Sequence, residues 1–228
     1  MSALFAFLFA AVTYSKLDYL PDAPLRTPKN ISPSSITICL DPGHGGEATG
    51  AVSYSGKLEK DLNLALAFEI RRALTNAGFK VVMTREDDRD VDLFARPAVA
   101  IMNDCDLFIS VHHNAPGPGG DPMKLRYSSV HSWNPIGKEL ADAIAVRWKA
   151  KSMHSNFVVT RNPCVPSVLL EADFITHPKG DKDSSDPSVR RIRAARVVAG
   201  VFDWLRIRCK GKNESIQIRQ GSCRLSVL

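Results

Sequence analysis

The sequence predicts an α/β protein with one open, mostly parallel twisted sheet and helices on both of its faces. Short apolar runs typical of buried strands alternate along the chain with longer segments whose apolar residues recur at helical spacing. The 228 residues suffice for a single α/β domain with short extensions. The 44% hydrophobic and 24% charged residues are ordinary for a globular protein and argue against disorder throughout the chain.

Five short apolar runs are expected to form strands. They lie at residues 36–40, 79–84, 107–111, 157–160 and 167–170. The first run, ITICL, ends abruptly in Asp41-Pro42-Gly43-His44-Gly45-Gly46, which reads as a tight glycine-rich loop.

Four segments with apolar residues at helical spacing are expected to form helices. They lie at residues 59–77, 92–104, 135–151 and 187–205. Gly78 is suited to end the first helix, and Asp186 followed by Pro187 is typical of the start of the last one. Pro97 conflicts with the second helix unless it lies in the first turn.

The two ends of the chain differ in character from this domain. Residues 1–19 contain the apolar run ALFAFLFAAV, which predicts a signal peptide or an N-terminal anchor and therefore export to the periplasm, cell envelope or exterior. Residues 20–35 are rich in proline and serine and read as an extended linker. Residues 36–208 form the expected folded domain, and residues 209–228 a basic tail.

Positive charge is concentrated near the C-terminus. From Arg190 onward there are ten basic and two acidic residues, which gives +8 in a chain whose net charge is +6. Such an end is suited to contact an anionic envelope polymer. Because no base-stacking aromatic cluster or nucleic-acid-binding module accompanies it, no nucleic-acid partner is expected. We expect the protein to be a monomer.

The five cysteines do not reveal the redox compartment. Cys39 and Cys105 lie in apolar context and read as small core residues. Cys209 and Cys223 flank a short polar segment and are able to pair if the protein is exported, so the question stays open.

Polar residues follow three of the expected strands. His44 lies just past the first, His112 ends the run LFISV, and Glu171 ends the run SVLL. Since functional sites of open α/β sheets gather at the carboxyl ends of the strands, these three side chains are expected at one edge. With Glu59, at the start of a helix, the histidines supply two imidazoles and a carboxylate, a donor set that catalytic zinc accepts. His113 is expected to point away, because neighbouring residues of a strand face opposite sides.

The motifs resemble, in order, those of zinc-dependent N-acetylmuramoyl-L-alanine amidases, the amidase type 3 family. The matching stretches are Leu40-Asp41-Pro42-Gly43-His44-Gly45-Gly46, Leu58-Glu59-Lys60-Asp61-Leu62-Asn63-Leu64, Thr84-Arg85, Leu93-Phe94-Ala95-Arg96, Ser110-Val111-His112-His113-Asn114-Ala115 and Pro166-Ser167-Val168-Leu169-Leu170-Glu171. The resemblance covers roughly residues 36–205.

The resemblance implies a role for each site residue. His44, Glu59 and His112 are expected to hold one zinc ion, and Glu171 to be the catalytic acid/base. The expected reaction is hydrolysis of the amide between N-acetylmuramic acid and L-alanine in bacterial peptidoglycan. Asn114 and His177 are candidate substrate contacts.

Two residues are expected to support the metal ligands, and two positions differ from the family pattern. Asp41, as a partner of a ligand histidine, and Arg85 are candidates to support the ligands from behind. Asp173 and His177 stand where the family usually has glycine and asparagine. Residues 116–134 are too few to hold the long helix that plugs the zinc site of regulated relatives.

Two other functions fit parts of the sequence. Another zinc peptidoglycan hydrolase, such as a stem-peptide carboxypeptidase, would use similar metal chemistry. A peptidoglycan-binding module without activity would not need all four predicted site residues, and their joint presence disfavours it.

Overall fold

The computed structural model describes residues 32–162 and 165–210, without the side chains of residues 209 and 210. The expected N-terminal signal or anchor, most of the linker, most of the basic tail and the pairing of Cys209 with Cys223 lie outside the described residues. Among the described helices, none is long and apolar enough to span a membrane.

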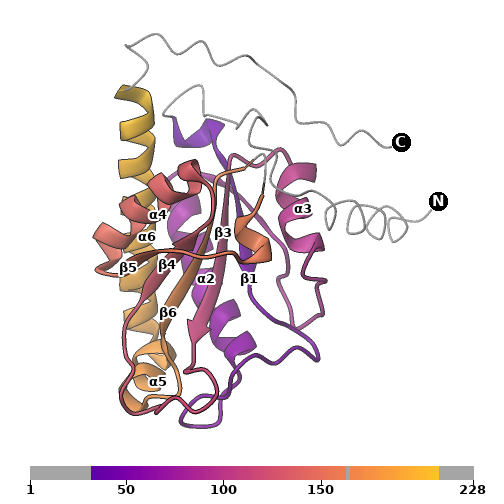
Figure 1. Ribbon diagram of the computed structural model, residues 1–228. Coiled ribbons are helices and arrows are strands. Elements are labelled where there is room, and N and C mark those ends of the chain that lie inside the picture. The colour runs from indigo at the N-terminus through magenta and orange to yellow at the C-terminus, as the bar shows by residue number, and fades with distance from the viewer. Residues whose placement is uncertain (1–31, 163–164, 211–228) are drawn as a thin grey trace, which may run out of the picture.

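One sheet of six strands organises the described part of the chain, in the order β2-β1-β3-β6-β4-β5 (Figure 1). The strands are β1 (Thr37–Pro42), β2 (Lys80–Met83), β3 (Leu107–Asn114), β4 (Ser129–Ser132), β5 (Lys151–His154) and β6 (Ser167–Phe174). All neighbouring pairs are parallel except β4 and β6, which are antiparallel. The predicted mostly parallel sheet is therefore confirmed.

Five α-helices and two 3₁₀ turns complete the described elements. They are η1 (Pro33–Ser35), α2 (Glu59–Asn76), α3 (Ala95–Met102), α4 (Pro135–Trp148), η2 (Val158–Thr160), α5 (Pro178–Ser185) and α6 (Pro187–Lys210). The Asn134 side chain accepts a hydrogen bond from the Gly137 amide and so caps α4, whose end is marked by Lys149 in the left-handed conformation. Pro97 lies in the first turn of α3, which resolves the conflict seen in the sequence.

Two apolar layers cover the two faces of the sheet. Leu40, Ile109 and Leu170 belong to the larger core, to which α2, α4 and α6 contribute. Their strand neighbours Cys39 and Phe108 lie in the smaller core beneath α3 and η2. Because residues alternate between faces along a strand, polar residues at the ends of the strands can be assigned to a side. By this alternation His112 and Glu171 lie on the α3 side of the sheet.

Several elements differ from the sequence expectations. Residues 157–160, predicted as a strand, form η2, where the Thr160 hydroxyl hydrogen-bonds to the Ser155 and Phe157 carbonyls and holds the turn. The helix predicted for residues 135–151 ends at Trp148, and Lys151 begins β5 instead. The strands β4 and β5 and the helix α5 were not predicted. The four residues of β5 are all exposed, so they show no apolar pattern.

Candidate metal centre

The loop after β1 brings the first histidine to the carboxyl edge of the sheet. His44 has a φ of 61°, a left-handed backbone that costs free energy in a residue other than glycine and is held by its surroundings. Gly43 precedes it and packs directly on a second histidine: a Cβ added at Gly43 would lie 2.1 Å from the His112 ring. Glycine is therefore required there for the two histidines to approach each other.

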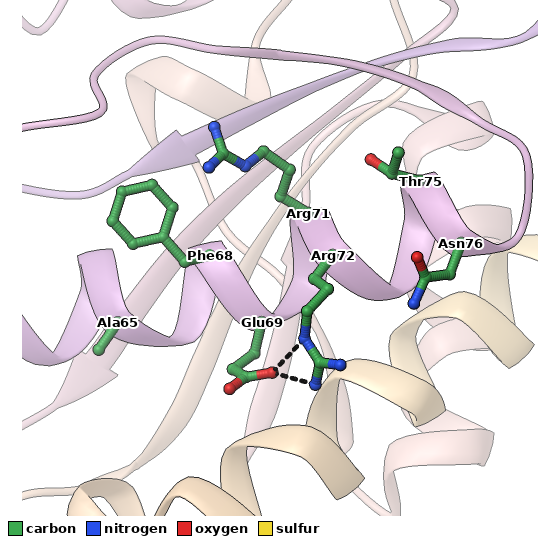
Figure 2. A pocket seen from close by; sticks show the side chains of 7 residues that line it. All are labelled: Ala65, Phe68, Glu69, Arg71, Arg72, Thr75 and Asn76. Atoms are coloured by element: carbon green, nitrogen blue, oxygen red, sulfur yellow. Dashed lines mark hydrogen bonds and ion pairs between the residues drawn. The ribbon is translucent and has the colours of Figure 1, made fainter.

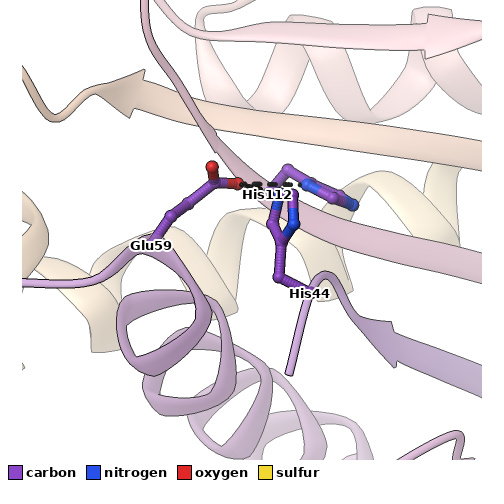
Figure 3. A group of neighbouring side chains, drawn as sticks. All are labelled: His44, Glu59 and His112. Carbon is purple, nitrogen blue, oxygen red and sulfur yellow. Dashed lines mark hydrogen bonds and ion pairs between the residues drawn. The ribbon is translucent and has the colours of Figure 1, made fainter. Parts of the chain in front are cut away.

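His44, Glu59 and His112 point toward one another from three separate elements (Figure 3). The Glu59 Oε1 atom lies 3.2 Å from His44 Nε2 and 3.1 Å from His112 Nδ1. One potential ligand atom from each of the three residues lies within 4.8 Å of the others. The predicted triad is thus assembled and could hold a metal ion.

The position of Glu59 is fixed by the helix and the neighbouring loop. Glu59 is the first residue of α2, where the helix dipole favours a negative charge. Its Oε2 atom accepts a hydrogen bond from the Ala51 amide at 3.0 Å, and its Oε1 atom accepts one from Asn63 at 3.1 Å. Burial alone would raise the pKa of Glu59, but hydrogen bonds from His112 and His44 outweigh it and hold the pKa well below its usual range. The carboxylate is therefore ionised, as a metal ligand must be.

The donor set and its access fit a catalytic ion. A tetrahedral zinc ion with bonds of about 2.0–2.2 Å has ligand atoms about 3.4 Å apart, close to the separations of Glu59 Oε1 from the two imidazole nitrogens. The side chain of His44 is 31% exposed and that of His112 is 19% exposed, so solvent or substrate can reach this side of the triad. Residues 115–128, between β3 and β4, contain turns and no helix that covers it.

The neighbouring histidine has a different role. His113 lies on the opposite side of β3, where it is buried and its Nδ1 atom lies 2.8 Å from Asn63 Oδ1. Burial, followed by the charge of Arg193, lowers the pKa of His113 to about 3, so this imidazole is neutral. The expectation that His113 points away from the metal ligands is confirmed.

Glu171 lies beside the triad in the sheet. It is paired with His112 across β3 and β6, so the two side chains are neighbours on one face. Its Oε2 atom is buried and has no hydrogen-bond partner among the residues that the structure describes. Burial and the charge of Glu59 raise the pKa of Glu171 to about 8. A carboxyl group with such a pKa can both release and accept a proton near neutral pH.

Two buried arginines hold the loop that carries His44. Arg85 donates to the carbonyl oxygens of Pro42 and Gly43 at 2.9 and 3.0 Å, which accords with its expected supporting place. Arg96 donates to the carbonyl oxygens of Pro42 and His44, both at 2.9 Å. The left-handed turn at His44 is thus fixed by guanidinium groups from two other segments.

Asp41 lies behind the ligand loop, in a network of buried polar groups. It is fully buried, and its carboxylate pairs with Arg96 at 2.8 Å and accepts hydrogen bonds from the Thr84 and Ser110 hydroxyls at 2.6 and 2.7 Å. Burial alone would raise the pKa of Asp41, but the Arg96 charge and the two hydroxyl groups lower it. None of the described hydrogen bonds joins this carboxylate to a histidine ring, but the charge of His112 also lowers the pKa of Asp41. Asp41 also orients Arg96, which in turn holds the His44 backbone.

The two departures from the family pattern lie apart from the triad. The strand β6 has one extra residue opposite His113, and beyond this bulge the buried Asp173 faces α6, where it pairs with Arg193 at 3.0 Å. His177 is the N-cap of α5, and its Nδ1 atom accepts a hydrogen bond from the Lys179 amide. The structure does not bring either residue to the metal ligands.

Asn114 is closer to the site. It is the last residue of β3, two positions after His112, and therefore belongs to the same face of the sheet. The structure thus places this candidate substrate contact beside the triad.

Sequence reasoning missed two residues that shape the site. Asn63 connects three parts of it, because its side chain contacts Glu59, His113 and the Gly43 carbonyl. The sequence did offer a signal for Asn63, because a polar residue stands there on the apolar face of a helix, four positions after Glu59 and therefore next to it on the helix surface. Gly50 is the other, since a Cβ there would lie 2.6 Å from Glu59 and 2.7 Å from His44.

A shallow hollow on the outer side of α2 is distinct from this centre (Figure 2). It is lined by side chains of α2 only, and the Arg72 and Glu69 side chains within it pair with each other at 2.6 Å. Its charged side chains are already paired, Arg72 with Glu69 and Arg71 with Glu86. We therefore assign this hollow no part in the chemistry.

Comparison with known proteins identifies relatives of the chain. The family model described as N-acetylmuramoyl-L-alanine amidase matches residues 38–203. The amidase AmiA of Escherichia coli is 27% identical over 217 residues, which cover 73% of this chain and 75% of AmiA. The probable cell wall amidase LytH of Staphylococcus aureus is 33% identical over 174 residues, which cover 72% of this chain and 57% of LytH. The chain spans about half (52%) of the amidase AmiC of Neisseria meningitidis.

Solved structures agree with this relationship. An N-acetylmuramoyl-L-alanine amidase from Clostridium difficile superposes with a TM-score of 0.68 at 28% identity, covering 75% of this chain and 97% of that one. The amidase AmiC2 of Nostoc punctiforme superposes with a TM-score of 0.69 at 25% identity, with the same two coverages. The ordered motifs, the sheet and the family match agree, and the chain belongs to the amidase type 3 family of N-acetylmuramoyl-L-alanine amidases.

Proposed function

We propose that this chain is a zinc-dependent amidase that hydrolyses the bond between N-acetylmuramic acid and L-alanine in peptidoglycan. The single observation that carries the proposal is the convergence of His44, Glu59 and His112 beside a buried carboxyl group, Glu171. Family membership supports the choice of bond. The donor set of two imidazoles and one carboxylate supports zinc.

The residues of the chain would divide the chemistry as follows. His44, Glu59 and His112 would hold the zinc ion, which would supply Lewis-acid chemistry at the scissile carbonyl and at water. Glu171 takes the proton of the attacking water and delivers it to the nitrogen of the departing L-alanine. In the metal-free chain, burial followed by the charge of Glu59 raises the pKa of Glu171 to about 8, and a bound zinc dication would lower it from there. Its place beside His112 in the sheet supports the role of proton carrier. Asn114, on the same face, is proposed to contact substrate.

Asp41, Arg85 and Arg96 act indirectly, through the ligand loop. Their contacts keep the carbonyl groups of residues 42–44 turned inward, and this fixes where the His44 ring lies. A positioning role of this kind is common around catalytic metals, where groups behind the ligands set their orientation.

The cellular setting follows from the substrate. Peptidoglycan lies outside the cytoplasmic membrane, so we propose an exported protein that acts in the periplasm, envelope or exterior, as a monomer. The basic residues near the C-terminus would aid contact with anionic wall polymers. In the described part of that segment, Arg208 pairs with Glu139 and Arg206 with Asp203.

Product analysis tests the proposal directly. Purified peptidoglycan fragments are digested by the protein with and without a chelator, and the products are identified by mass spectrometry. We expect an intact stem peptide with a free L-alanine amine, and no such product with chelator. Release of D-alanine alone would show a carboxypeptidase, and binding without any product would show a non-catalytic module.

A further inference from the structure

We propose that Lys151 binds a carboxylate of the stem peptide, three or four residues away from the scissile amide. This inference rests on the proposed function and names a determinant of its substrate preference. It starts from a row of four residues that are paired across adjacent strands: His112, Glu171, Ser129 and Lys151.

The row connects the metal ligands with the edge of the sheet. Residues paired across strands point to the same face, so the side chain of Lys151 on β5 shares the face of His112 and Glu171. Adjacent strands lie about 4.8 Å apart, so three such steps separate the backbone of His112 from the backbone of Lys151 by about 14 Å. Because β5 is an edge strand and Lys151 is exposed, a ligand lying across this face can reach its ammonium group.

A second set of contacts fixes where that ammonium group lies. Asn114 pairs with Phe174 beyond the bulge, and the Tyr127 ring packs on Phe174 with the centroids 4.9 Å apart. The Lys151 Nζ atom lies 3.9 Å from the centroid of the Tyr127 ring, a cation–π contact. A chain of contacts therefore connects Asn114, through the buried Phe174 and the Tyr127 ring, with a positive charge.

Arg85 is held by carbonyl oxygens, and three other cations around the triad have carboxylate partners. These pairs are Arg96 with Asp41, Lys60 with Asp88, and Arg126 with Asp173 and Asp183. Within the described ranges, no carboxylate oxygen lies within 4 Å of the Lys151 Nζ atom. Lys151 is thus an exposed cation of this face whose charge is left for a ligand.

The distance matches the chemistry of the proposed substrate. An extended peptide advances about 3.3–3.6 Å per residue, so about 14 Å corresponds to three or four residues beyond the metal. Every stem peptide ends in a carboxylate, which at this distance would meet the ammonium group of Lys151. Binding so far from the reacting atoms is the same in ground and transition states, and it is therefore expected to change KM and not kcat.

Two substrates test this assignment. One is a muramoyl tetrapeptide with free peptide carboxylates, and the other is the same compound with every peptide carboxylate converted to an amide. For the zinc-loaded full chain, we expect Lys151→Gln to raise KM about five- to tenfold on the first substrate, with kcat unchanged, and to leave the amidated substrate unaffected. Lys151→Arg keeps the charge and should restore the wild-type KM. Lys80→Gln, which removes an exposed lysine from the opposite edge strand, is the matched control.

A binding measurement makes the result independent of turnover. Calorimetry of the free tetrapeptide with the Glu171→Gln variant should show affinity that falls by the same factor when Lys151→Gln is added. Equal KM values for Lys151→Gln and wild type, or an equal rise on both substrates, would overturn the assignment. A wild-type chain that releases peptide from neither substrate would overturn the proposed function and this inference together, whereas cleavage of both with no effect at Lys151 overturns the inference alone.

Discussion

Replacement of Asp41 by alanine is expected to be the most destabilising single change to the supports of the metal centre. Asp41 is 0% exposed, and its loss leaves Arg96, which is 5% exposed, as a buried charge without its carboxylate. Removing one partner of a buried ion pair costs about 3–5 kcal/mol. The Thr84 and Ser110 hydroxyls also lose their acceptor, so the upper part of that range is expected.

Chemical denaturation with urea at pH 7 measures this effect on the metal-free protein. The control is Asp203→Ala, because Asp203 pairs with Arg147 at the surface, where such a pair contributes about 1 kcal/mol or less. Asp41→Ala should also weaken zinc binding, since Arg96 then no longer holds the His44 carbonyl. A loss of stability no larger than that of Asp203→Ala would refute the proposed support of the loop by a buried ion pair.

The ion pair of Asp41 with Arg96 also determines how the stability of the folded protein changes with pH. The pKa of Asp41 is lower in the folded protein than in the unfolded chain. Its stabilising contribution is therefore fully present above the unfolded pKa of about 3.9 and is lost as the pH falls toward the folded value.

Three further predictions concern the ligand loop, the buried histidine and the tail. Gly43→Ala should abolish zinc binding and turnover, because the new Cβ would lie 2.1 Å from His112; Gly117→Ala, which meets nothing within 4 Å, should leave both intact, and metal analysis with activity assays decides. His113, with its pKa lowered to about 3, should cost stability as the pH falls below about 6.5, by up to about 1.4 kcal/mol per pH unit. Urea unfolding of the metal-free protein at pH 7 and pH 5 should show a smaller pH dependence for His113→Gln, and an unchanged dependence would count against a buried neutral imidazole. Deletion of residues 211–228 should weaken sedimentation with whole anionic walls at low salt while turnover of a soluble muropeptide stays nearly constant, because exposed charges act through a screened long-range field. A large loss of turnover on the soluble fragment would show instead that the tail completes the site.

Much of the fold could be predicted because its central strands are buried on both faces. Runs such as LFISV are apolar except for one serine, and the residue that follows each run marks the edge where sites gather. This is why His44, His112 and Glu171 could be placed near one another from the sequence.

The strands β4 and β5, at one edge of the sheet, could not be predicted in this way. The strands β4 and β5 have one apolar residue each, Val130 and Met153, and β5 is exposed. Pairing with a neighbouring strand, and not an apolar pattern, therefore defines both. The apolar residues before Thr160 favour a strand locally, but side-chain hydrogen bonds to the backbone turn them into η2.

The supports of the site could be predicted only in part. The residue types and order of the motifs indicated that Arg85 and Arg96 matter, yet their acceptors are carbonyl oxygens, which are the same at every position of a sequence. The orientation of Asp173 depends on the bulge in β6. Without the extra residue, alternation along the strand would turn this side chain to the metal side, whereas with it the side chain faces Arg193. Neither feature has a local pattern that reveals it.

The most direct test of the central claim compares Glu171→Gln with His44→Ala for zinc content and turnover. Glu171 is proposed as a proton carrier and not a ligand, so Glu171→Gln should keep one zinc per chain and the fold, while kcat falls on the order of 10²-fold or more. His44→Ala leaves two protein ligands and should lose both metal and activity. A zinc-free Glu171→Gln variant would make Glu171 a fourth ligand, and a fully active one would assign the proton transfer to another group; either result would contradict the account.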